Sequence, residues 1–192
     1  MTDNQTGFLV PLLKRTSGYM KCISPMRWFA CFIPNLRNPS ANATETYVLI
    51  CLMIELAIGL AFLSPISQLS IVGWLFGVLA VLRIVEIMGR TIDVTDVIDP
   101  ARTLVLGGIN YVELSFCFGV IYALNYQSLQ MASRPITAFY FSIITQLTIG
   151  YGDVSPKGWM RLVAATQGLI GALFVISVFA RAIAALPIQK SK

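Results

Sequence analysis

Residues 145–153 read TQLTIGYGD and lie between two long apolar runs of the chain. In this string Gly150 and Gly152 alternate with larger residues, and a glycine adopts a positive φ angle at little cost. Such alternation can turn successive backbone carbonyls toward the same side. Four strings of this kind around one axis would form stacked rings of oxygen atoms, which can replace the water shell of a monovalent cation. The string therefore predicts an ion-conducting site.

Three side chains of the string have expected places around such rings. The Thr148 hydroxyl can add a ring at the inner end, Tyr151 would point away from the axis and brace the string, and Asp153 would lie at the outer mouth. The segment before the string, residues 135–147, is apolar but too short to span a membrane, which takes about 20 residues. A short apolar segment followed by a glycine-rich return predicts a re-entrant loop, which membranes tolerate only where protein buries it or it lines a watery cavity.

The rest of the chain has the composition of a membrane protein. Of its 192 residues 56% are hydrophobic and only 12% are charged, whereas about a quarter of a soluble domain is charged. Histidine is absent, which removes the commonest general base and metal ligand. We therefore predict a protein that is not an enzyme. Four apolar segments are expected to span the membrane, from about Thr46 to Leu63, Ile66 to Met88, Thr103 to Tyr126 and Trp159 to Leu186.

The basic residues predict the orientation of these spans. The net charge is +5, and most of the 14 Lys and Arg residues fall on the side of the two termini. The positive-inside rule then places both termini in the cytoplasm and the glycine-rich string outside. No basic face with interleaved aromatic residues is present, so we expect membrane lipid and no nucleic acid as a partner. The expected location is the plasma or inner membrane of the cell.

The expected organisation has five parts. Residues 1–45 form a cytoplasmic or interfacial segment, 46–90 two accessory transmembrane helices, 91–102 an amphipathic cytoplasmic linker, 103–186 a pore domain and 187–192 a short tail. In the linker, Asp93, Asp96 and Asp99 share one helical stripe. They form either a solvated helix face or a divalent-ion or proton sensor. Asp99 followed by Pro100 predicts an N-cap that opens the third span.

The pattern T-x-x-T-x-G-Y-G-D resembles the signature of the potassium channels, of the bacterial type with a single pore loop per subunit. The resemblance covers roughly residues 101–186. It implies an all-α pore domain with an outer helix, a pore helix, a selectivity filter and an inner helix. Because one pore loop cannot close a ring, it also implies a homotetramer. K⁺ ions would be coordinated by the backbone carbonyls of Thr148, Ile149, Gly150 and Tyr151 and by the Thr148 hydroxyl, with Gly152, Asp153, Thr145 and Tyr140 in support.

Two departures from the family pattern concern the surroundings of the filter. Tyr140-Phe141 stands where many members carry Trp-Trp, and the Tyr140 hydroxyl can still hydrogen-bond Asp153. Ile144 stands where some bacterial members carry a glutamate that pairs with the aspartate. We therefore expect altered inactivation of the filter.

The inner helix carries the gating candidates. Gly171 falls where many members have a hinge glycine, although a glycine there can equally serve close helix packing. Ala172, Val175 and Phe179 would face the pore, with Phe179 or Ile183 near the cytoplasmic constriction.

The first two spans are not required by a minimal pore. A voltage sensor needs several arginines at three-residue spacing, and the second span offers only Arg83 and Arg90, so strong voltage sensing is not expected. Glu55 and Glu113 lie inside spans, so each needs a partner or contact with water. Depth in the membrane allows Arg83 to pair with Glu55.

Three functions remain open at this point. The first is passive, K⁺-selective conduction through a tetrameric pore with K⁺ as the bound ion. The second is a non-selective cation channel, which a deformable filter would produce. The third is an accessory membrane subunit that does not conduct alone. The reversal potential in mixed Na⁺ and K⁺ separates the first two, and the absence of flux from the purified homomer would mark the third.

Overall fold

A computed structural model of the chain describes residues 41–62, 70–92, 99–132 and 134–184. Two of the expected parts therefore lie mostly or wholly outside the described residues: the N-terminal segment before residue 41 and the tail at 187–192. Asp93 and Asp96 of the expected linker also lie outside them, while Asp99 is described.

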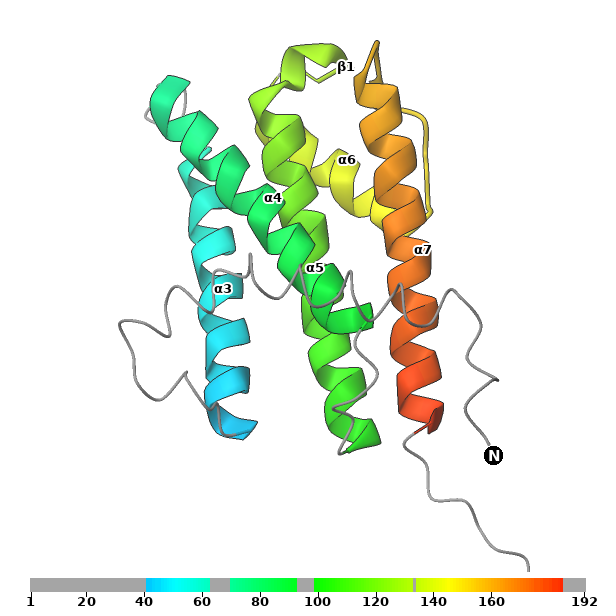
Figure 1. Cartoon of the computed structure of the whole chain (residues 1–192). Coiled ribbons are helices and arrows are strands. Elements are labelled where there is room, and N and C mark those ends of the chain that lie inside the picture. The colour runs from blue at the N-terminus through cyan, green and yellow to red at the C-terminus, as the bar shows by residue number, and fades with distance from the viewer. Residues whose placement is uncertain (1–40, 63–69, 93–98, 133, 185–192) are drawn as a thin grey trace, which may run out of the picture.

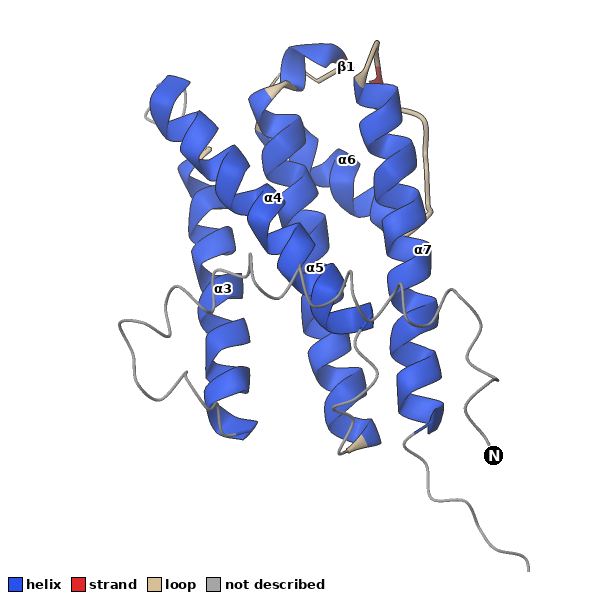
Figure 2. Cartoon of the chain, in the orientation of Figure 1, coloured by secondary structure: helices blue, strands red, loops and turns tan. Residues whose placement is uncertain are grey.

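The described residues form long helices with a short two-stranded pairing (Figure 2). In chain order the elements are α3 (Ala41–Ala61), α4 (Ser70–Ile92), α5 (Pro100–Leu124), the 3₁₀ turn η3 (Tyr126–Ser128), β1 (Leu129–Gln130), α6 (Ile136–Gln146), β2 (Ser155–Pro156) and α7 (Met160–Ala184).

Four of the helices are long and apolar enough to cross a membrane: the stretches are Thr44–Ala61, Ile71–Thr91, Pro100–Leu124 and Met160–Ala184. This confirms the prediction of four candidate spans and a multi-pass membrane protein. Helix α3 begins five residues before the expected span, at Ala41 rather than Thr46. Its first turns carry Thr44 and Glu45, polar residues that the apolar pattern alone assigned to the preceding segment.

Helix α5 is the centre of the bundle, since α3, α4, α6 and α7 all pack against it. In Figure 1, α3, α5 and α7 run alongside one another, α4 slants across α5, and α6 lies obliquely beside one half of α5 and α7. The start of α5 follows the sequence prediction. Asp99 is the N-cap, its side chain accepts a hydrogen bond from the Ala101 amide, and Pro100 occupies the first turn.

Two glycines of α5 let α6 and α7 approach closely. A Cβ on Gly119 would lie 2.5 Å from Cδ1 of Phe139 in α6, and one on Gly107 would lie 2.6 Å from Cγ1 of Val178 in α7. Both distances are too short for any real Cβ, so glycine is required at each crossing. The two contacts fix α6 and α7 against the same helix and so position the segment between them.

Candidate functional site

The segment that contains the glycine-rich string begins and finishes at the same end of the helix bundle. Strand β1 precedes α6 and pairs antiparallel with β2, which follows the string, in the register Leu129 with Pro156 and Gln130 with Ser155. The Lys157 amide also donates to the Ser128 carbonyl at 2.8 Å. Everything between these residues, including α6 and the string, is therefore a loop whose two ends are tied together.

The string starts from the last turn of α6. Beyond that helix, the Leu147 amide donates to Ile143 O at 2.9 Å and the Ile149 amide to Ile144 O at 2.9 Å. These bonds hold the first residues of the string under the carboxyl end of α6. The negative end of a helix dipole favours a cation nearby, so the position suits a cation path.

Backbone conformation alternates along the string. The φ angles of Thr148, Gly150 and Gly152 are 56°, 55° and 80°, so every second residue is left-handed. Nothing lies within 4 Å of a Cβ built on Gly150 or Gly152. Backbone conformation, rather than lack of space, therefore calls for glycine there. A positive φ at threonine is a rare outlier for a β-branched residue, and strain of this kind gathers at functional sites.

The string is an open surface in the single chain. Ile149 is 46% exposed and Tyr151 is 70% exposed. In a folded chain, large apolar side chains gathered on a continuous stretch mark an interaction surface. Tyr151 is largely exposed in the single chain, so its expected role as a brace for the string stays a prediction.

Tyr140 and Asp153 meet at the far end of the string. The Tyr140 hydroxyl donates to Asp153 Oδ2 at 2.7 Å, as the sequence allowed. Asp153 Oδ1 accepts from the Val154 amide at 3.0 Å. The hydrogen bond to Asp153 raises the pKa of the Tyr140 hydroxyl above its usual range. Ile144 is buried behind the string and offers no polar partner, so this tyrosine is the side chain that ties α6 to Asp153.

A buried polar network lies behind the string, and the sequence reasoning missed it. Gln167 of α7 donates through Nε2 to Ser142 O at 2.9 Å and to Gln146 Oε1 at 3.0 Å. Its Oε1 accepts from the Tyr122 hydroxyl at 2.9 Å. The Tyr111 hydroxyl of α5 donates to Gln146 O at 2.6 Å. The network thus joins α5, α6 and α7 at the residue where α6 ends.

The one available signal for this network was the presence of Gln146 and Gln167 in apolar helices, because a polar side chain buried at such a place needs partners.

Gly171 packs directly on this network. Helix α7 continues unbroken through it, and a Cβ there would lie 2.9 Å from Gln146 Nε2. The structure therefore supports the close-packing interpretation of this glycine, and a hinge at the same position stays a prediction.

Helix α7 has one buried side and one exposed side. The buried residues are Met160, Gln167, Gly171, Phe174 and Ala182. Among the gating candidates, Phe179 and Ile183 are both more than half exposed. Ala172 is exposed and Val175 is half-buried. The residues expected to face a pore thus lie mainly on the side of α7 that this chain leaves uncovered.

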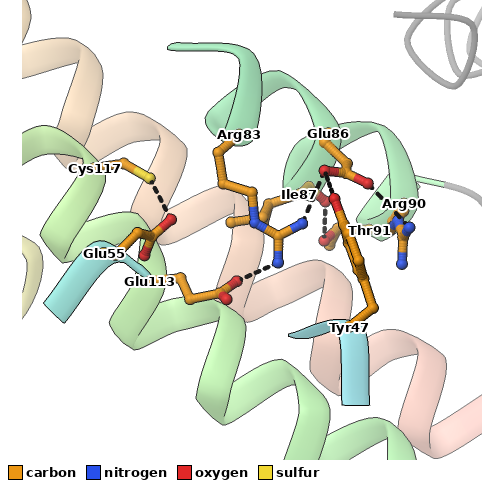
Figure 3. Close-up of polar contacts among 9 residues, drawn as sticks. All are labelled: Tyr47, Glu55, Arg83, Glu86, Ile87, Arg90, Thr91, Glu113 and Cys117. Atoms are coloured by element: carbon orange, nitrogen blue, oxygen red, sulfur yellow. Dashed lines mark hydrogen bonds and ion pairs between the residues drawn. The ribbon is translucent and has the colours of Figure 1, made fainter. Parts of the chain in front are cut away.

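The pair of Arg83 with Glu55 that depth allows is not the one the structure contains. Arg83 instead binds Glu113 Oε2 of α5 at 2.6 Å and Glu86 Oε2 of its own helix at 2.8 Å (Figure 3). Glu55 accepts a hydrogen bond from the Cys117 thiol at 3.1 Å. Similar depth in the membrane did not decide the partner, because Glu86 lies one turn from Arg83 on the same helix and Glu113 projects from the central helix.

Comparison with known families bears on the same part of the chain. Residues 111–186, from within α5 to the end of α7, match a family model described as "Ion channel". The match supports an ion channel. No curated protein and no solved structure matches the chain. The matched residues include α6, the string with its alternating backbone, and α7, so the family match and the site geometry fall on the same segment.

Proposed function

We propose that the chain is one subunit of a homotetrameric, K⁺-selective channel that conducts passively across a cell membrane. The observation that carries the proposal is the alternation of left-handed φ angles at Thr148, Gly150 and Gly152 in an exposed string. This alternation is what aligned carbonyl oxygens require, and rings of such carbonyls replace the hydration shell of K⁺.

In this proposal K⁺ is the bound and transported ion. The backbone carbonyls of Thr148, Ile149, Gly150 and Tyr151 and the Thr148 hydroxyl coordinate it. The tie between Tyr140 and Asp153 supports the outer end of the string. Thr145 and Gly152 are the other supporting residues in this proposal.

Assembly of four copies accounts for the surface that a single chain leaves open. The string and the exposed side of α7 present large apolar side chains, among them Leu169, Ile176 and Phe179. In a ring of four, the strings face the axis, Tyr151 packs against the neighbouring copy, and the exposed side of α7 lines the inner cavity. Phe179 or Ile183 then forms the constriction, with Gly171 as the candidate hinge.

The orientation proposed here places both termini in the cytoplasm. The starts of α3 and α5 meet through Glu45 and Arg102, whose Oε1 and Nε atoms lie 2.8 Å apart. The ends of α4 and α7 meet through Arg181, which donates to the Arg90 carbonyl at 2.8 Å. Positive residues gather on the side that faces the cytoplasm, which supports the cytoplasmic assignment of the ends that carry these arginines.

The proposal is tested by reconstituting the purified protein in liposomes and measuring ⁸⁶Rb⁺ or K⁺ uptake with Na⁺ as competitor and Ba²⁺ as blocker. Native mass spectrometry of the same sample gives the number of copies. Four copies with Ba²⁺-blocked uptake that Na⁺ does not compete with is the expected result. Uptake that Na⁺ competes with equally would indicate a non-selective cation channel. A tetramer without flux under any voltage or pH would contradict conduction by the homomer.

A further inference from the structure

A second polar site lies away from the string, between α3, α4 and α5 (Figure 3). Its centre is Glu55 of α3, which is 7% exposed, and Glu113 of α5, which is fully buried. We call these two side chains, with the thiol of Cys117, the α3–α5 acid site. All three side chains lie within candidate membrane spans. A carboxylate in such a place is costly and needs a partner or a function.

Among the described side chains that bind one another around this site, carboxylates outnumber guanidinium groups. The surrounding cluster holds three carboxylates and two guanidinium groups, on Glu55, Glu86, Glu113, Arg83 and Arg90. Arg83 is bound to Glu86 and Glu113, and Arg90 is bound to Glu86 Oε1 at 3.0 Å with its side chain 26% exposed. Arg181 lies beyond Arg90 and donates to backbone carbonyls there. Among these five described side chains, one negative charge therefore remains if every carboxyl is ionised, and Glu55 is the carboxyl bound through a thiol rather than through a guanidinium group.

The titratable and charged groups around Glu55 come from all three helices. On α5 the facing groups are Glu113 and the Cys117 thiol, and on α4 they are Arg83 and Glu86. On α3 itself, the Tyr47 hydroxyl donates to Glu86 Oε2 at 2.9 Å rather than to Glu55. The thiol of Cys117 is thus the hydrogen-bond donor that Glu55 has, and a thiol is a weak donor.

The hydrogen bonds also show that the two carboxylates lack a donor. Glu55 Oε2 and Glu113 Oε1 are buried and have no hydrogen-bond partner, and they are the two carboxylate oxygens in that condition within the described part of the chain. Two ionised carboxylates cannot satisfy each other, because neither has a hydrogen to donate. A proton on one carboxyl supplies a donor and removes the excess charge at the same time. Leaving such groups unpaired and charged is the costly alternative.

We propose that the α3–α5 acid site is a proton-binding site in which Glu55 holds a proton while α3 is packed on α5. The protonated carboxyl accepts from the Cys117 thiol through Oε1 and carries the proton on Oε2, the oxygen that has no hydrogen-bond partner. A metal ion is the less suitable occupant, since no three His, Cys, Asp or Glu side chains in the described ranges converge as ligands.

Loss of the proton restores a buried, uncompensated charge next to Glu113. The packing of α3 against α5 then becomes unfavourable, so α3 separates from α5 as pH rises. The site is independent of the string and of K⁺, and it gives the two helices outside the matched family segment a chemical role of their own.

Infrared difference spectroscopy of the purified full chain at neutral pH tests the proposal directly. The carbonyl stretch of a protonated carboxylic acid, identified by its shift in D₂O, is expected in the wild type. It should disappear in Glu55→Gln. It should persist in Glu45→Gln, a matched change at a half-exposed glutamate that pairs with Arg102. Absence of the band in the wild type, or a band that survives Glu55→Gln, would overturn the proposal.

Thermal unfolding is a second measurement, in which failure of Glu55→Gln to fold is itself an outcome that decides. Glutamine has nearly the shape of protonated glutamate, so the proposal expects that variant to unfold at a temperature close to that of the wild type at neutral pH. The wild type should lose thermal stability as pH rises, with one more proton released on unfolding than in Glu55→Gln. If Glu55→Gln is much less stable or does not fold, an ionised Glu55 is required and the proposal is wrong.

Discussion

Gln167 is the side chain through which α7 holds the residue where α6 ends. Replacing it with leucine keeps the volume and removes both hydrogen-bonding groups. The Tyr122 hydroxyl and Gln146 Oε1 then lose the partners that lie 2.9 and 3.0 Å away. Tyr122 is 0% exposed and Gln146 is 1% exposed. We therefore expect two buried polar atoms without a partner.

The cost follows from the number of groups left unpaired. Each buried donor or acceptor without a partner costs about 1–3 kcal/mol, so Gln167→Leu should lower the free energy of unfolding by about 2–6 kcal/mol. Adding Tyr122→Phe removes one of the two unpaired groups. The double variant should therefore be more stable than Gln167→Leu alone, by about 1–3 kcal/mol.

Denaturant unfolding in detergent micelles measures these differences, and flux in liposomes shows whether the string keeps its geometry. Gln127→Leu, at an exposed glutamine, is the matched control and should change stability by no more than about 0.5 kcal/mol. The account of the network is refuted if Gln167→Leu lowers the free energy of unfolding no more than the control does. It is also refuted if the double variant loses as much free energy of unfolding as the two single variants together.

Three further predictions concern other contacts. Gly119→Ala should destabilise the protein by about 1–3 kcal/mol, because the new Cβ would lie 2.5 Å from the Phe139 ring. Equal melting temperatures of this variant and the wild type would contradict the close contact between α5 and α6. Arg83→Met should cost about 3–5 kcal/mol, since buried carboxylates lose their partner, and a neutral result in the same unfolding assay would contradict the ion-pair geometry. Tyr140→Phe should speed the decay of K⁺ current, because it removes the hydrogen bond that holds Asp153. The same hydrogen bond raises the pKa of Tyr140, so the decay of wild-type current should not change with pH up to about 10, the ordinary pKa of tyrosine. Decay that accelerates well below that pH would contradict the tie.

Much of the fold follows from patterns within single segments. Run lengths of apolar residues predicted four candidate spans, and Asp99 with Pro100 predicted the start of α5. The alternation of glycines in residues 145–153 predicted left-handed backbone at Gly150 and Gly152, which the structure contains. These signals succeed because a span, a cap and a turn depend on neighbouring residues.

The partners of buried polar groups did not follow from the sequence. Depth allowed Arg83 to meet Glu55 on α3, but Arg83 binds Glu86 and Glu113. The Gln167 network joins residues up to 45 positions apart. Such pairings depend on how helices rotate about their axes, and apolarity on every side of a membrane helix leaves that rotation undetermined. The positive φ of Thr148 was missed for a different reason, since only the assembled loop imposes it on a β-branched residue.

The measurement that tests the central claim most directly is the relative permeability to K⁺ and Na⁺ of Gly150→Ala beside Gly108→Ala in liposomes. Gly150 has a φ of 55°, a conformation that costs alanine about 1–2 kcal/mol. If the backbone of Gly150→Ala relaxes to a negative φ, the carbonyl at this position turns away from the proposed axis. Gly108 lies on α5 with no atom within 4 Å of a built Cβ. K⁺-selective flux that Gly108→Ala keeps and Gly150→Ala loses is the predicted result. Selective flux of wild-type size from Gly150→Ala would contradict the account.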